Sequence, residues 1–362
     1  MHQFFDLKIF FLMICLFLWA CDSESSTSSL DANPSVQSKS WQTQQTFVEG
    51  AILNVFGSKL TGDVFAVGGQ PKSGKLWHLN KSTNQWETLE IEDGPLLNWG
   101  AITSRADQSE FETWLVGSEG RILRKRSQNL ANGTWEKIES PTNLDLWGVW
   151  AKDQNEAWAV GGNAADEESM EAILLKWNGN VWEKITLPTF DRSGVRALFK
   201  VFGVGKWIFA VGMKGVIIGA QRDAQGQVGT WQQFKISPIT GSIASTEDLI
   251  SLWGNQEDQI MAVGGRSNGI VVRWDGESWQ SSLQVGVPGL NGVWMAESGE
   301  AFVVGGRGSI LSYAVDSFEG KRWRTDTTLV LHSVWGNEIG LWGVGGSLDN
   351  TPPWEGIILD LE

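Results

Sequence analysis

Short apolar runs, separated by polar and glycine-rich stretches, recur along the chain from residue 40 to its last residues. The seven clearest runs are KLWHL, GRILR, AILLKW, GVIIG, GIVVRW, GSILSY and GIILDL, which end at residues 79, 124, 177, 219, 274, 313 and 361. Runs this short, rich in Val, Ile and Leu and bounded by Gly, Asn and Asp, predict β-strands rather than helices.

A tryptophan marks the end of each of seven similar units. These tryptophans are Trp41, Trp86, Trp135, Trp182, Trp231, Trp279 and Trp323, with spacings of 45, 49, 47, 49, 48 and 44 residues. Six units also carry a hydrophobic-aromatic step, such as Val149-Trp150, and all seven carry a later Val-Gly step, such as Val160-Gly161. In the second unit we place Ala101-Ile102 at the first of these steps. Each unit is therefore predicted to contain four strands.

Two local features of the repeat have structural explanations. The glycine of the Val-Gly step is expected to let a neighbouring backbone approach closely. Asn178-Gly179 and Asp275-Gly276 are expected to supply the positive φ angles of tight turns between strands three and four.

Four-stranded units of this period predict an all-β fold, a seven-bladed β-propeller with four antiparallel strands per blade. The seventh unit ends at Glu362 after three strands, and Ser40 to Thr46 forms a lone strand at the other end of the repeat. Together they make one blade, so the N-terminal strand is predicted to close the ring. The propeller should span residues 40–362.

The repeats resemble those of bacterial exported lipoprotein propellers, with the pattern L-x-x-V-W-G, then A-V-G-x-x-G-x-I-L, then W-x-G-x-x-W. Residues 290–323, LNGVWMAESGEAFVVGGRGSILSYAVDSFEGKRW, match this pattern best, apart from a longer last hairpin. More distantly, the chain is similar to kelch, Asp-box and photosystem II assembly-factor propellers.

The first twenty residues are typical of an export signal. Residues 9–20, IFFLMICLFLWA, form an apolar core behind Lys8 that is too short to span a membrane. The sequence Leu18-Trp19-Ala20-Cys21 resembles the bacterial lipobox, which implies cleavage after Ala20 and diacylglycerol, with acylation such as palmitate, on Cys21. Residues 1–20 are thus predicted to be a lipoprotein signal peptide, and the Ser-rich residues 21–39 a lipidated flexible tether. By resemblance to enterobacterial lipoprotein sorting, Asp22 directly after the lipidated cysteine implies retention on the periplasmic side of the inner membrane; the outer membrane and cell surface are the alternatives.

Charge and cysteine content bear on the partners and on the disulfide or metal sites that can be expected. The formal net charge of −14 disfavours nucleic acid as a partner, since such binding depends on clustered Lys and Arg. The two cysteines, Cys15 and Cys21, both precede the propeller, so no disulfide or thiolate metal site is expected within it.

The sequence offers few catalytic groups, and we predict no enzyme activity, metal or cofactor. His78 and His332 occupy non-equivalent repeat positions. Tyr313, the only tyrosine, lies where a propeller places residues away from its axis, which disfavours a sialidase-type glycoside hydrolase. The acidic loop with Asp166, Glu167, Glu168 and Glu171 lacks a calcium-binding pattern.

Three residues are candidate ligand contacts. His332 and Asn291 occupy an inner-strand position whose equivalents we take to be Leu53, Trp99, Trp147, Phe199 and Ile250. Trp354 lies outside the repeat in the loop DNTPPWEG and is expected to be exposed. The other tryptophans recur at fixed positions, which favours a place in the core between blades.

We therefore expect a non-enzymatic envelope lipoprotein, anchored to the membrane at Cys21, that binds a protein or peptide. The alternative is a carbohydrate-binding, lectin-like propeller that contacts a glycan. On one face we expect the irregular loops, residues 70–74, 163–171, 238–248 and 347–355, to carry specificity.

Overall fold

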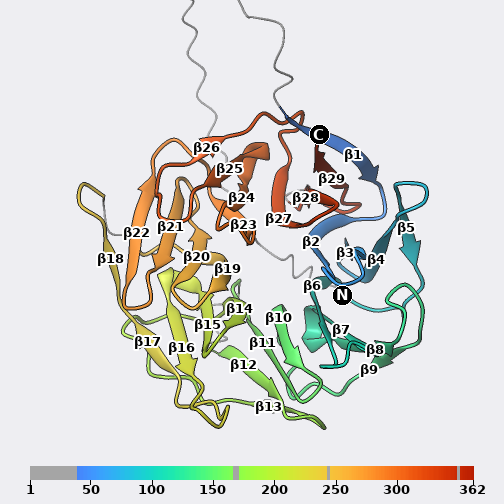
Figure 1. Cartoon of the computed structure of the whole chain (residues 1–362), viewed down its shortest axis with the longest axis horizontal. Coiled ribbons are helices and arrows are strands. Elements are labelled where there is room, and N and C mark those ends of the chain that lie inside the picture. Colours follow the sequence, from blue (N-terminus) through green and yellow to red (C-terminus); the bar gives the residue numbers. More distant parts are fainter. Residues whose placement is uncertain (1–38, 166–170, 243–244, 349–350) are drawn as a thin grey trace, which may run out of the picture.

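The computed structural model describes residues 39–165, 171–242, 245–348 and 351–362. Within these residues, the strands form seven sheets around a central axis, as Figure 1 shows. The predicted seven-bladed all-β propeller, with four antiparallel strands per blade, is confirmed. Among the described residues, no helical segment has the length and apolarity that a bilayer crossing needs.

Each blade is a meander whose first strand lies next to the axis (Figure 1). The first four blades consist of β2 (Ala51–Gly57), β3 (Val64–Gln70), β4 (Ser73–Asn80) and β5 (Gln85–Leu89); β6 (Leu97–Ser104), β7 (Phe111–Gly117), β8 (Ile122–Ser127) and β9 (Trp135–Lys137); β10 (Leu146–Asp153), β11 (Glu156–Gly162), β12 (Ala172–Trp177) and β13 (Trp182–Lys184); and β14 (Leu198–Val204), β15 (Trp207–Gly212), β16 (Ile217–Gln221) and β17 (Gln232–Phe234).

Blade five has a fifth strand, because β18 from the preceding linker pairs in parallel with β22. The strands of blades five to seven are β18 (Ile236–Pro238), β19 (Leu249–Gln256), β20 (Gln259–Gly264), β21 (Gly269–Trp274) and β22 (Trp279–Gln284); β23 (Leu290–Met295), β24 (Ala301–Gly305), β25 (Ile310–Tyr313) and β26 (Lys321–Arg322); and β27 (Val330–Asn337), β28 (Gly340–Gly346), β29 (Gly356–Leu361) and β1 (Trp41–Phe47).

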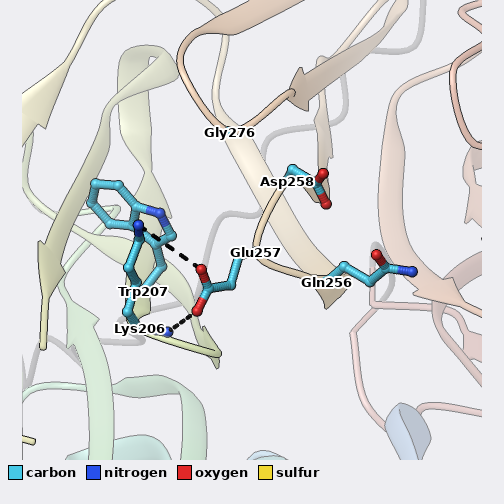
Figure 2. A pocket seen from close by; sticks show the side chains of 6 residues that line it. All are labelled: Lys206, Trp207, Gln256, Glu257, Asp258 and Gly276. Carbon is cyan, nitrogen blue, oxygen red and sulfur yellow. Dashed lines mark hydrogen bonds and ion pairs between the residues drawn. The ribbon is translucent and has the colours of Figure 1, made fainter. Parts of the chain in front are cut away.

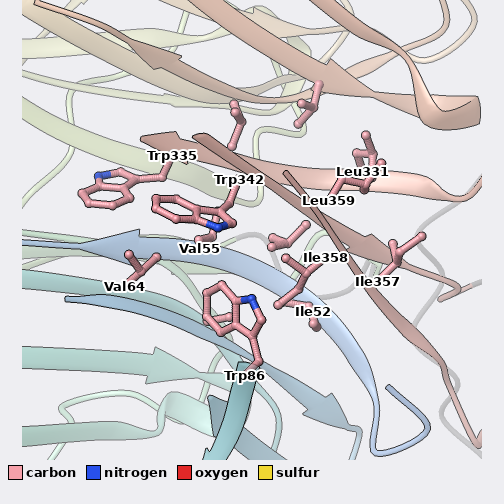
Figure 3. Packing of buried hydrophobic residues seen from close by; sticks show 14 of the residues in the cluster. Ile52, Val55, Val64, Trp86, Leu331, Trp335, Trp342, Ile357, Ile358 and Leu359 are labelled. Atoms are coloured by element: carbon pink, nitrogen blue, oxygen red, sulfur yellow. The ribbon is translucent and has the colours of Figure 1, made fainter. Parts of the chain in front are cut away.

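Blade seven joins the two ends of the repeat, as the sequence predicts. The N-terminal strand β1 pairs antiparallel with β29, from Trp41 opposite Leu361 to Phe47 opposite Gly356. A large apolar cluster lies between blades seven and one, and Figure 3 shows Trp335 and Trp342 of blade seven close to Val55 and Trp86 of blade one. Burial of this cluster stabilises the closed ring.

The Val-Gly step has the role that the sequence indicates. In every blade the first strand carries one extra residue, a β-bulge, opposite this step. A Cβ on any of the seven glycines would lie only 2.0 to 2.4 Å from a backbone carbonyl oxygen. The bulge therefore requires glycine because the two backbones approach too closely for a side chain.

The turns between strands three and four differ from the prediction in one detail. Gly179 and Gly276 have φ angles of 97° and 98°, but Asn178 and Asp275 do not have positive φ. Instead, the Asn178 and Asp275 side chains accept hydrogen bonds from backbone N–H groups two and three residues later. These turns are longer than two-residue hairpins, and the Asn or Asp side chain stabilises them.

Candidate functional site

Three rings of residues from the first strands surround the axis. The bulge ring holds the seven extra residues, Leu53, Asn98, Trp147, Phe199, Ile250, Asn291 and His332. The next residue of each strand forms the middle ring, namely Asn54, Trp99, Gly148, Lys200, Ser251, Gly292 and Ser333. Two residues further on lies the aromatic ring, namely Phe56, Ala101, Trp150, Phe202, Trp253, Trp294 and Trp335.

This register corrects the sequence alignment in blade two. The extra residue there is Asn98, because Leu97 pairs with Gly117 and Trp99 pairs with Val116. Trp99 is thus the equivalent of Asn54 rather than of Leu53, and Ala101, not Ile102, takes the aromatic position. A one-residue shift changes which side of the strand a side chain occupies, so Trp99 enters the middle ring.

The aromatic ring explains the aromatic-glycine step of the repeat. A Cβ on Gly203 would lie 2.3 Å from the ring of Trp150 in the preceding blade, and one on Gly57 would lie 2.6 Å from Trp335. Trp150 and Trp335 therefore each pack on a glycine of the next blade. The rings of Phe202 and Trp253 also contact each other, with centroids 4.7 Å apart.

A cavity of about 150 Å³ lies on the axis between the middle and aromatic rings. Aromatic and aliphatic side chains make up most of its wall, and Asn54, Lys200 and Ser333 supply the polar side chains. Lys200 is 2% exposed. Its Nζ lies 3.1 Å from the centroid of the Trp99 ring. None of the described residues that line the cavity is acidic.

Both polar atoms of the Asn54 side chain form hydrogen bonds within this site. Its Oδ1 accepts a hydrogen bond from the Gly100 backbone N–H at 3.0 Å, and its Nδ2 donates to Ser333 Oγ at 3.0 Å and to the Val55 carbonyl. The Ser333 hydroxyl accepts from Asn54 and keeps its own proton available for donation. Ser251 is 1% exposed, and its Oγ has no hydrogen-bond partner among the described residues.

The environment of Lys200 disfavours its charged form. Burial lowers the pKa of its ammonium group well below the usual 10.5, and no nearby carboxylate opposes this effect. The face of Trp99 is the only described group that attracts the charge. Sequence analysis missed this site; the signal was a lysine inside the apolar inner strand LFKVFG.

The structure places His332 and Asn291 in the bulge ring, and neither lines the cavity. Asn291 donates from Nδ2 to the Leu331 carbonyl of the next blade at 3.1 Å. Burial lowers the pKa of His332 to about 4, although a hydrogen bond with the Gly346 backbone opposes the shift. Its Nε2 has no partner among the described residues. Their role as ligand contacts stays a prediction.

Trp354 is not exposed, contrary to expectation. Its side chain is 7% exposed and packs against Ala51 and Leu96, because the loop turns back onto blade one. Gln70 fixes the backbone of Trp354 through two hydrogen bonds of 2.9 Å. Five of the seven closing tryptophans are buried, and the other two, Trp135 and Trp323, are partly buried and pack against core clusters.

Tyr313 lies away from the axis, as predicted. It ends the third strand of blade six, is fully buried, and donates from its hydroxyl to Gln284 Oε1 at 3.3 Å. Burial raises the pKa of Tyr313 to about 12. A phenol with this pKa and this enclosure is a poor nucleophile.

A larger hollow of about 390 Å³ lies on the surface between blades four and five. Figure 2 shows Glu257 reaching toward Lys206 in this hollow. Glu257 Oε1 accepts from the Lys206 backbone N–H at 2.7 Å, and Oε2 lies 3.9 Å from Lys206 Nζ. The carboxylate and the amine are thus already paired with each other.

Several predicted sites cannot be placed. Ala20 and Cys21, with the signal peptide and most of the tether, lie outside the described residues, as do Asp166, Glu167 and Glu168. Within the described residues, no group of three or more His, Cys, Asp or Glu side chains is placed to hold a metal ion.

Comparisons with known proteins show the fold. No protein-family model matches the sequence, and no curated protein matches it. Among solved structures, the chain is similar to the crystal structure of the WD40 β-propeller domain of Doa1, with 12% sequence identity and a TM-score of 0.58. The match covers 88% of this chain and 96% of that chain. At this identity the likeness establishes a β-propeller and leaves the resemblance to bacterial lipoprotein propellers a prediction.

Proposed function

We propose that this chain is a non-enzymatic, lipid-anchored propeller of the bacterial cell envelope that binds a protein or peptide partner. The fold is compatible with a protein-binding scaffold. The proposal depends chiefly on one observation, the unequal loops on one face, which we name the loop face. It holds the connections between strands two and three and between successive blades.

On the loop face, the connections between blades differ in length, as a short one at residues 48–50 and a much longer one at residues 185–197 show. The longer one is held in place, because Asp191 and Gln233 exchange two hydrogen bonds of 2.9 and 2.5 Å. Shaped loops on a rigid scaffold are a common source of binding specificity. The loop face also presents Val48 and Val285, each 80% exposed.

The opposite face, which we name the turn face, supplies the matched control. It holds the connections between strands one and two and between strands three and four. Leu60 and Ile339 are exposed there by 57% and 61%. A photo-crosslinking amino acid can replace the native residue at these two exposed apolar positions of each face.

The test is crosslinking in the native envelope followed by mass spectrometry. We expect probes at Val48 and Val285 to capture a protein that probes at Leu60 and Ile339 do not. Equal capture from both faces would contradict the loop-face assignment. A saturable glycan on an array, with no crosslinked protein, would replace the proposal with the lectin-like alternative.

The lipid anchor has a separate test. Intact mass of the membrane-extracted protein should show a diacylglyceryl-sized gain that the variant Cys21→Ser lacks. Two or more acyl chains would hold the protein on the membrane almost permanently, because each buried methylene contributes about 0.8 kcal/mol. An unmodified, soluble product would contradict the anchor.

A further inference from the structure

The axial cavity contains a buried lysine amine that no acidic group pairs with, and a bound anion would favour the charged form of this amine. Lys200 is 2% exposed, and none of the described lining residues is acidic. Lysine is almost never fully buried without a partner, because removing an ammonium group from water is costly. In this protein its only described attraction is the face of Trp99, at 3.1 Å from the ring centroid. The site therefore has an unused capacity for one negative charge.

The middle ring adds a hydrogen-bond donor at the same level of the axis. Ser333 Oγ accepts from Asn54 and still has a proton to donate. Ser251, in the blade next to Lys200, has a second middle-ring hydroxyl without a partner among the described residues, but it does not line the cavity, so Ser333 is the hydroxyl donor of the site. An ammonium group with a hydroxyl donor is suited to carboxylate oxygens, which accept hydrogen bonds only.

The aromatic part of the cavity wall favours an organic anion over a purely inorganic one. Phe202, Trp253 and Trp335 line the cavity with aromatic surface that a small organic group would cover. A cavity of about 150 Å³ lined by apolar side chains is large enough for a molecule of about the size of benzene. One cation balances a single negative charge, so a multiply charged anion would remain unbalanced.

We propose that the axial cavity binds a small organic monocarboxylate, whose carboxylate pairs with Lys200 Nζ and whose apolar body packs against the aromatic ring. This site is independent of the loop face and of the partner that the loop face binds. It makes the propeller a receptor for a small acid as well as a scaffold.

The test measures binding of benzoate, butyrate and acetate to the full chain in detergent, by calorimetry and by fluorescence of the cavity tryptophans. Benzamide, which has the same shape without the charge, is the matched ligand. We expect wild-type protein to bind benzoate more tightly than benzamide by about tenfold or more, because only the carboxylate forms a charge-assisted hydrogen bond with the Lys200 ammonium group.

The variant Lys200→Met keeps the length of the side chain and removes its charge. It should abolish or reverse the preference for benzoate while still binding benzamide, which shows that the cavity is intact. Lys206→Met, at an exposed lysine of the same blade outside the cavity, should leave the preference unchanged. The proposal is overturned if wild type binds none of the three carboxylates, or if Lys200→Met retains the preference for benzoate.

Discussion

Arg222 Nη2 donates a hydrogen bond of 2.5 Å to Glu156 Oε1, and this ion pair joins blade four to blade three. The two side chains are only 7% and 11% exposed. The same carboxylate oxygen accepts from Trp158 Nε1 at 2.8 Å. The guanidinium group also lies over the ring of Trp150, 5.5 Å from its centroid. One carboxylate thus organises the boundary between two blades.

Removing one partner of this pair should destabilise the protein strongly. We expect Arg222→Met to lower the free energy of unfolding by about 3 kcal/mol, because it removes the buried cation beside Glu156 and leaves only the more exposed Lys152, whose Nζ lies 3.5 Å from Oε2. Chemical denaturation measures the change. Glu297→Gln, which breaks the exposed pair with Lys59, is the control and should cost less than about 1 kcal/mol. Equal losses in the two variants would show that burial does not determine the cost.

The same pair should make stability fall in acid. Burial raises the pKa of Glu156, but hydrogen bonds from Arg222 and Trp158 outweigh this effect, so its pKa lies below the usual 4.5. The folded state therefore gains stability above pH 4.5 and loses it as pH falls through the lowered pKa. The difference in unfolding free energy between wild type and Glu156→Gln should shrink over that range; a constant difference would contradict the assignment.

The glycine of the Val-Gly step should not tolerate a side chain. A Cβ on Gly345 would lie 2.0 Å from the Val330 carbonyl oxygen, whereas one on Gly343, in the same strand, would lie 3.4 Å from its nearest neighbour, the Trp41 ring. We expect Gly345→Ala to cost about 3 kcal/mol or more and Gly343→Ala about 1 kcal/mol or less. Thermal unfolding of both variants measures the contrast, and similar melting temperatures would contradict it.

Lys200→Met should stabilise the protein in the absence of ligand. The pKa of Lys200 is well below 10.5 in the folded state, so the unfolded chain binds its proton more tightly. Stability should therefore rise with pH from the lowered pKa up to about 10.5, the value for an exposed lysine. The gain from Lys200→Met should be largest below this range and disappear at its upper end. A gain that does not change with pH would mean that Lys200 titrates normally.

His332 should remain neutral in the folded protein down to about pH 4, because burial lowers its pKa from 6.5. The unfolded chain then binds one more proton between these two values, so stability falls as pH decreases through this window, by up to about 1.4 kcal/mol per pH unit. NMR titration of the His332 ring should give a midpoint near pH 4, and His332→Asn should remove the slope. A midpoint near pH 6.5 would contradict an enclosed ring.

The architecture could be predicted from the sequence because the same structural requirements recur in every blade. The Val-Gly glycine and the closing tryptophan recur in seven units, so comparing the units with one another identifies these positions. Closure by β1 also follows from the sequence, because the last unit has only three strands and the lone strand at Trp41 supplies the fourth.

The candidate site was less accessible to sequence analysis. Trp99 was assigned to the wrong ring because blade two lacks the aromatic residue of the hydrophobic-aromatic step, although the extra residue follows an Ile or Leu in every blade. Lys200 was overlooked because the lysine stem fits an apolar strand and only the closed ring encloses its amine. Trp354 seemed exposed because its loop is outside the repeat, yet tertiary packing turns it onto Ala51.

Closure by β1 and β29 also sets an order of folding. The strand that begins at Trp41 finds its partner only after Gly356 to Leu361 have been synthesised, so the ring stays open until then. Until then β1 presents an unpaired edge that other chains can join. A nascent chain that lacks β29 therefore carries the greatest risk of aggregation, and a variant truncated before β29 would leave the first strand without its partner.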